Sequence, residues 1–257
     1  MGLFGGGIKR GEETVLRRII KIFGILLVLL GIMSSLYPLI SQLHFQCQAD
    51  NVIARYDEWV KDKSEKPGKE QDSKEETQDN FLLEKLYQIM RAYNEKIYTQ
   101  KQAELVDPFS YQQTDISLTT FGLPDEVVGH IEIPNIKVRL PIYLGANDDN
   151  MSKGAVHLTQ TSYPIGGINT NSVIAAHRGY ANAAMFRNIE QIVIGDRITV
   201  TNFREKLNYK VTDIAIIAPS EIDRVLIQEG KDMVTLITCH PYRQNYQRYV
   251  IYATREI

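Results

Sequence analysis

Hydrophobic and polar positions divide the 257-residue chain into stretches of different periodicity. After a short N-terminal tail, residues 1–18, a nearly continuous apolar run extends from Ile19 to Ile40. This run is long enough to cross the hydrocarbon core of a membrane as a helix, so we predict a transmembrane anchor over residues 19–41. Within the next segment, residues 42–80, the stretch from Asp57 to Asn80 is dominated by Lys, Glu, Asp, Ser and Gln. That composition cannot bury a core and predicts a solvated polar linker.

The pattern changes to helical spacing at Phe81 and to strand-like alternation at Val127. Apolar residues recur three or four positions apart up to Leu105, which predicts an amphipathic helix in a helical segment over residues 81–126. Residues 127–257 alternate in short runs between glycine-bearing or polar turns and predict a mainly β domain. Many short strands indicate a sandwich or a closed barrel, with short helices expected over residues 181–191 and 221–228.

Charges around the apolar run predict its orientation. Five basic residues lie before it or in its first turn, namely Lys9, Arg10, Arg17, Arg18 and Lys21. The outgoing flank, residues 41–48, has neither Lys nor Arg. The positive-inside rule then places Met1 in the cytoplasm and the β domain outside the cell, on a single-pass anchor. A cleaved signal peptide is the alternative, but the apolar run is longer than a usual signal core and no small-x-small site follows it.

Charge and cysteine content exclude several classes of function. A net charge of −2 gives no reason to expect a nucleic acid partner. The two cysteines, Cys47 and Cys239, form neither a disulfide framework nor a Cys-x-x-Cys metal site. We therefore expect two free thiols, no metal and no cofactor.

Cys239 stands at the end of a predicted strand and is the best candidate for chemistry. The strand formers Thr235 to Thr238 lead into the thiol, and His240-Pro241 then signals a turn. Arg248, nine residues after the cysteine, begins a second predicted strand. A thiol is a good nucleophile only as thiolate, and nearby positive charge favours that form.

His177 is the candidate acid or base, because it ends a predicted strand just before Gly179 and can project into a groove. Each of the three residues also has an ordinary structural interpretation when taken alone. Cys239 could be a small buried hydrophobe, His177 a satisfied histidine and Arg248 a surface cation. Their shared position at strand ends of one β domain favours the chemical interpretation.

The run Thr-Leu-x-Thr-Cys followed by an arginine nine positions later resembles the signature of sortases, the cysteine transpeptidases of Gram-positive surfaces. Residues 176–179 are similar to the segment that carries the sortase histidine. The resemblance extends from about Val127 to the C-terminus and includes Gly129–Pro134, Leu140–Tyr143, Gly154–Leu158 and Gly195-Asp196.

This resemblance implies a closed β-barrel of about eight strands in which Cys239 is the nucleophile, His177 the acid/base and Arg248 their electrostatic partner. The implied reaction cleaves an LPxTG-like sorting signal between Thr and Gly through a thioacyl-enzyme. An amine then resolves this intermediate and forms a new amide bond.

The class of sortase is indicated by Asp107-Pro108-Phe109, which resembles the lid of class C, pilus-assembling sortases. In that class the lid aspartate contacts the catalytic arginine and the aromatic ring covers the cysteine, which implies that Asp107 neutralises Arg248 and Phe109 shields Cys239. The match to the class C pattern Cys-x-Pro-Tyr-x-x-Asn-x-x-Arg is complete, although Arg243 stands where glycine is usual and Tyr246-Gln247 replace Thr-His.

Besides the class C interpretation, three alternatives stay open at the level of sequence. The class C reading implies a pilin or other LPxTG protein as donor and a pilin lysine as acceptor. A housekeeping class A enzyme would instead attach surface proteins to an amine of the cell-wall precursor. A hydrolytic cysteine protease would transfer the acyl group to water. A membrane-tethered β adhesion module would use Cys239 only as a core residue.

Overall fold

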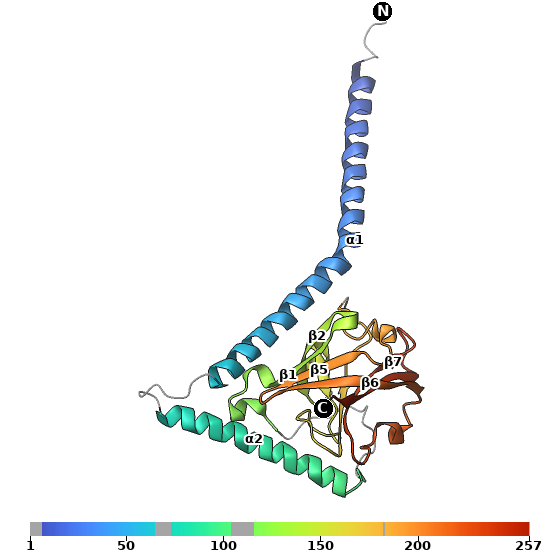
Figure 1. The fold of residues 1–257 in the computed structure, drawn as a ribbon. Coiled ribbons are helices and arrows are strands. Elements are labelled where there is room, and N and C mark those ends of the chain that lie inside the picture. The colour runs from blue at the N-terminus through green and yellow to red at the C-terminus, as the bar shows by residue number, and fades with distance from the viewer. Residues whose placement is uncertain (1–6, 65–72, 104–115, 182, 257) are drawn as a thin grey trace, which may run out of the picture. The chain divides into compact units, whose positions relative to one another are not determined.

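The computed structural model describes residues 7–64, 73–103, 116–181 and 183–256, and it divides the chain into two compact units, residues 1–44 and 45–257. Helix α1 begins at Gly7 and ends at Ser64 (Figure 1). Within the first unit its large apolar side chains from Val15 to Leu43 are exposed. The helix is long and apolar enough to cross a membrane, so it is a candidate membrane span.

The end of α1 belongs to the second unit and packs on its core. Ala49, Ile53 and Tyr56 recur at helical spacing and are buried, and the Tyr56 hydroxyl donates a 2.8 Å hydrogen bond to the Val128 carbonyl. Arg139 bonds Asp57 at 3.0 Å beside this contact. The structure differs here from the solvated linker that we predicted over residues 42–80.

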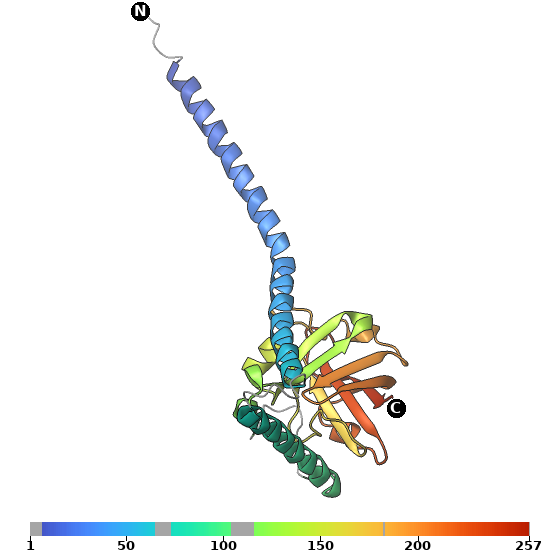
Figure 2. The same ribbon diagram turned by 60° about the vertical axis from the view of Figure 1, so that its left-hand side comes forward.

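Helix α2, Ser73–Thr99, is the predicted amphipathic helix. Leu86, Met90 and Ile97 are buried on its inner face. Asn94 fixes it to a loop of the barrel, since its side chain accepts a 2.7 Å hydrogen bond from the Tyr163 amide and donates one of 3.3 Å to the Tyr163 carbonyl. Figures 1 and 2 both show α2 along one side of the barrel.

Eight strands close into a barrel in the order β1-β2-β3-β4-β7-β8-β6-β5. The strands are β1 Val127–Ile133, β2 Val138–Leu144, β3 Ala155–His157, β4 Thr170–Ala175, β5 Arg197–Asn202, β6 Lys206–Ile217, β7 Asp232–His240 and β8 Gln247–Arg255. The pairs β2–β3 and β4–β7 are parallel, and the other ladders are antiparallel. Closure confirms the barrel and decides against the sandwich that the strand pattern alone also allowed.

Short helices join the strands in the described part of the second unit. They are η1 Leu118–Phe121, η2 Pro124–Glu126, η3 Pro134–Ile136, α3 Asp148–Lys153, η4 Ile189–Gln191 and η5 Ile222–Val225. The short helix expected over residues 181–191 is reduced to its last turn, because Ala181 and Met185 both have positive φ and interrupt any helix there. Residues 221–228 likewise contain only the single turn of η5.

The barrel interior is filled by the alternating apolar residues that predicted the strands. Ile131, Ile142, Ile174, Leu236 and Ile251 are all fully buried. Gly129 allows β1 to approach β5 closely, since a Cβ at this position would lie 2.1 Å from the Thr201 carbonyl oxygen. The packed interior therefore leaves the strand ends and their loops to form a site.

Candidate active site

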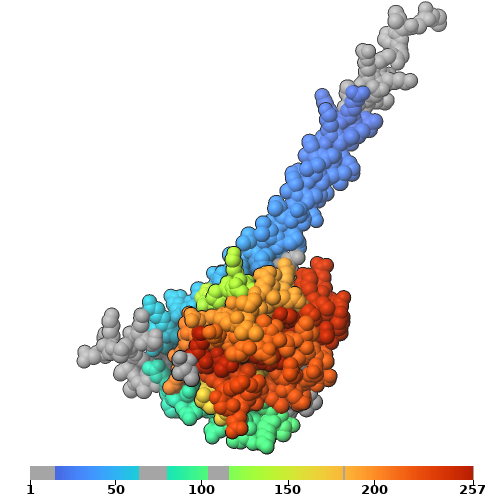
Figure 3. Space-filling model, turned by 45° about the vertical axis from the view of Figure 1, so that its right-hand side comes forward, coloured from blue at the N-terminus to red at the C-terminus, as the bar shows by residue number. Residues whose placement is uncertain are grey.

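Cys239 and Arg248 are direct cross-strand partners in the antiparallel β7–β8 ladder. Residues paired in this way have Cα atoms about 5 Å apart and side chains on the same face of the sheet. Cys239 is a half-buried free thiol near the end of β7. The strand pairing thus places the thiol and the cation side by side on one face. Figure 3 shows the face of the molecule to which the C-terminal strands, orange to red, contribute most of the surface.

The parallel register of β4 and β7 brings His177 to the same end of the barrel. Every pair in this ladder, from Thr170–Asp232 to Ala175–Ile237, joins residues 62 positions apart. Continued two residues beyond the last pair, the same register would set His177 opposite Cys239. The chain is held on this course because the Ala176 amide donates to the Ile237 carbonyl at 3.3 Å and the Thr238 hydroxyl donates to the Ala176 carbonyl at 2.7 Å.

The imidazole of His177 is half-buried against an aromatic ring. It stacks on Tyr180, with ring centroids 4.8 Å apart and an angle of 12° between the planes. Burial lowers the pKa of His177 from its ordinary value, and the carboxylate of Asp148 on α3 opposes that effect. Neutral imidazole is therefore the favoured form near neutral pH.

Arg248 is oriented by the turn between β7 and β8. Its Nη1 donates hydrogen bonds to the Asn245 carbonyl at 2.6 Å and to the Gln247 carbonyl at 3.1 Å. Arg243 in the same turn has φ of 65°, the left-handed region that glycine adopts without strain. This explains why glycine is usual at that position of the resembled pattern, and the arginine here keeps the same backbone conformation.

Behind these residues lies a polar contact that sequence reasoning missed. His240 was set aside because it precedes a proline, yet its Nδ1 lies 2.8 Å from Nη1 of the buried Arg178. The sequence offered one signal for this contact. Arg178 directly follows His177, and His240 directly follows Cys239. Asp107 and Phe109, the predicted lid, lie outside the described residues.

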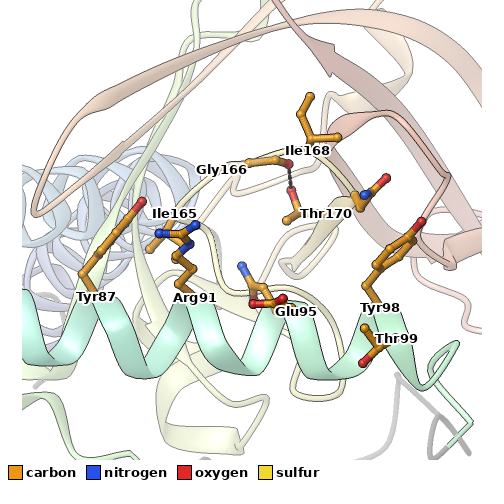
Figure 4. A pocket seen from close by; sticks show the side chains of 12 residues that line it. Tyr87, Arg91, Glu95, Tyr98, Thr99, Ile165, Gly166, Ile168 and Thr170 are labelled. Carbon is orange, nitrogen blue, oxygen red and sulfur yellow. Dashed lines mark hydrogen bonds between the residues drawn. The ribbon is translucent and has the colours of Figure 1, made fainter.

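The described residues also line a cavity of about 680 Å³ between α2 and residues 165–170. Figure 4 shows Tyr87, Arg91, Glu95 and Tyr98 rising from one face of α2 toward the loop that carries Ile168. Thr170 at its edge begins β4, whereas His177 follows the end of that strand. The cavity is thus at the opposite end of β4 from the candidate site. Across the described ranges, no group of three or more His, Cys, Asp or Glu side chains could hold a metal ion.

Comparison with known proteins decides the family. Residues 131–256 match the family model described as "Sortase domain". The crystal structure of Streptococcus pneumoniae Sortase C is 31% identical with a TM-score of 0.65, over 80% of this chain and 97% of that chain. The chain belongs to the sortase family. Sortases are cysteine transpeptidases, so the thiol at the end of β7 lies in an enzyme.

Two further relatives of this sortase differ in class. Sortase C2 of Group B Streptococcus Pilus Island 1 is 36% identical with a TM-score of 0.62, over 68% of this chain and 98% of that chain. Sortase A of Bacillus anthracis is 27% identical over 164 residues, which are 63% of this chain and 76% of the relative. The sortase is thus similar in structure to pilus sortases and in sequence to sortases A as well.

The environment of His177 predicts the effect of an Asp148→Asn substitution in this sortase. Loss of the carboxylate removes a charge that favours imidazolium, so the pKa of His177 should fall further below 6.5. NMR titration of the histidine in a Cys239→Ala background measures this without coupling to the thiol. Asp149→Asn is the matched control, because Asp149 is exposed and paired with Lys153. A rise in the pKa, or an equal fall in both variants, would contradict the assignment.

Proposed function

We propose that this sortase cleaves an LPxTG-like sorting signal between Thr and Gly and joins the threonine acyl group to a pilin lysine during pilus polymerisation. The observation that carries the proposal is the cross-strand pair Cys239–Arg248 with His177 at the same barrel end. The Streptococcus pneumoniae Sortase C that this chain resembles is described in terms of pilin substrate specificity. Two solved relatives come from pilus islands of Group B Streptococcus.

The proposed first step is attack by the Cys239 thiolate on the threonine carbonyl carbon. The new C–S bond forms as the C–N bond to glycine breaks, and the His177 imidazolium gives its proton to the leaving amine. In the second step an uncharged acceptor amine attacks the thioester and loses a proton to His177. The C–N bond forms and the thiolate leaves, so the enzyme returns to its starting state.

Protonation limits how much enzyme is ready for this step. The step needs thiolate and imidazolium in the same molecule, so only the fraction of enzyme in that doubly charged form can react. Burial of His177 lowers its pKa and reduces that fraction.

Arg248 is proposed to bind the carbonyl oxygen and the oxyanion that forms on it. Its Nη1 is engaged with two turn carbonyls, which fixes the plane of the guanidinium. A preorganised donor of this kind contributes about 10²–10³-fold to the rate.

The decisive experiment incubates the sortase with an LPxTG peptide, a candidate pilin and a cell-wall precursor amine, followed by mass analysis of every product. We expect an isopeptide bond between threonine and a pilin lysine. Cys239→Ala should abolish it, and Arg248→Lys should lower kcat by about 10²-fold, because an ammonium cannot reproduce the guanidinium fork. Arg197→Lys, at an exposed pair with Glu256, is the matched control.

Each other product identifies a competing function. Transfer to the precursor amine would support a housekeeping class A enzyme, which the resemblance to sortases A favours. Transfer to water alone would indicate a hydrolase. If Cys239 acquires no acyl group under any condition, the transpeptidase proposal is wrong and a non-catalytic β module takes its place.

We also propose that Asp107 and Phe109 form a lid over the site, on the strength of their resemblance to the class C lid. Substituting alanine for both should speed modification of Cys239 by a small alkylating reagent, since the aromatic cover and the charge partner of Arg248 are lost together. Mass analysis of the labelled cysteine measures the rate, with Ser110→Ala as control. An unchanged rate would count against a lid.

The N-terminus is proposed to be cytoplasmic and the barrel extracellular, from the basic residues before the apolar helix. Cys47 is exposed and is the remaining cysteine of a Cys239→Ala variant. A membrane-impermeant maleimide should therefore label that variant on intact cells. A cysteine introduced by Gly11→Cys, with both native cysteines replaced by alanine, should react only after permeabilisation. The reverse pattern would invert the topology.

A further inference from the structure

The residues that directly follow His177, Cys239 and Arg248 meet one another behind the candidate site. These are Arg178, His240 and Tyr249. Arg178 Nη1 lies 2.8 Å from His240 Nδ1, and its Cζ lies 5.9 Å from the centre of the Tyr249 ring. The rings of His240 and Tyr249 are 5.7 Å apart. We call these three residues the backing cluster.

Strand alternation explains why the backing cluster forms. Successive side chains of a strand point to opposite faces, and directly paired residues share a face. Because Tyr249 pairs with Thr238, both lie with His240 on the face opposite Cys239 and Arg248. Arg178 reaches this face from the segment after β4 and is only 6% exposed.

The hydrogen bond has a defined direction and a balanced charge. An arginine can only donate, so His240 Nδ1 accepts in this bond. Arg178 Nη2 makes a 2.6 Å ion pair with Glu190 Oε1 on η4, and the same carboxylate oxygen lies 3.4 Å from His240 Nδ1. The buried cation thus has an imidazole nitrogen from β7 and a carboxylate from a neighbouring loop as partners, while its Nε is buried without one.

The bond between Arg178 and His240 connects the two chain segments that carry the acid/base and the nucleophile. Thr238 already holds Ala176 at the strand end. Beyond that point the β4–β7 ladder has stopped, and Gly179 follows with φ of 92°. The Arg178 bond is therefore a side-chain contact that ties this segment to β7 past the end of the ladder, and the Phe186 amide holds the His177 carbonyl as well, at 3.1 Å.

We propose that Arg178 and His240 are positioning residues whose hydrogen bond holds the His177 segment against the end of β7, so that imidazole and thiol keep the geometry for proton transfer. This inference rests on the proposed roles of His177 and Cys239. It explains how a histidine that touches neither substrate nor reacting atoms contributes to turnover. A misplacement of about 1 Å can cost up to about 10²-fold in rate.

The test compares two substitutions of His240 in the full-length protein. His240→Leu keeps bulk but removes the acceptor, whereas His240→Asn supplies an amide oxygen close to the position of Nδ1. We expect His240→Leu to lower kcat at least about tenfold with KM for the sorting peptide within about twofold, and His240→Asn to restore most of kcat. His44→Leu, in the first unit, is the matched control and should behave as wild type.

Hydrogen exchange of residues 177–180 provides a readout that needs no activity. Exchange should rise in His240→Leu and return toward wild type in His240→Asn, while Trp59 fluorescence shows that all variants are folded. If the wild-type sortase does not transpeptidate, the proposed function fails, and the exchange data still decide whether the bond orders this segment. Unchanged kcat and exchange in His240→Leu, or a folded His240→Asn that is as slow as His240→Leu, would overturn the proposal.

Discussion

The register of three neighbouring strands is the constraint on which the rest of the structure depends. The β4–β7 and β7–β8 ladders determine which residues lie near Cys239 at the barrel end, through backbone hydrogen bonds that the Thr238 hydroxyl supplements at Ala176. Closure of the barrel fixes these ladders, since no strand can slide without disturbing its neighbours on both sides. The active-site residues are therefore placed by the same bonds that hold the fold together.

This arrangement separates two kinds of polar environment across one sheet. On the side of the candidate site, burial lowers the pKa of His177 and favours its uncharged form. On the opposite face, Arg178 is charged and buried, and its charge is met by Glu190. The two sides of these strands thus differ in their polar groups. One side carries the titratable His177, and the other carries the ion pair between Arg178 and Glu190.

Much of the catalytic domain could be predicted from sequence because its strands alternate clearly. The long run Tyr209–Ile217 appears as β6, and the two strands around Cys239 appear as β7 and β8. The strand pattern alone did not predict closure, because strand partners such as Val173 and Thr235 are far apart in the chain, and only the resemblance to sortases implied a closed barrel. The three-residue strand β3 is too short to give a periodic signal.

Other features could not be recognised in the sequence, because the residues around them indicated a different role. Ala49, Ile53 and Tyr56 pack on the core, but the charged residues around them give the segment the composition of a linker. Arg178 looks like a surface cation until the fold brings His240 to it. Residues of this kind depend on contacts between distant segments, and local pattern alone cannot reveal them.

The pairing of Cys239 with Arg248 also constrains the length of the intervening turn, but it does not constrain the side chains in that turn. A single residue inserted in the turn would shift β8 by one position against β7, so that Arg248 would move to the opposite face while Cys239 stays where the β4–β7 ladder holds it. The identity of the side chains in the turn carries no such constraint. Arg243 adopts a left-handed backbone conformation that glycine usually takes. The fold therefore constrains the length of this turn more strongly than its composition.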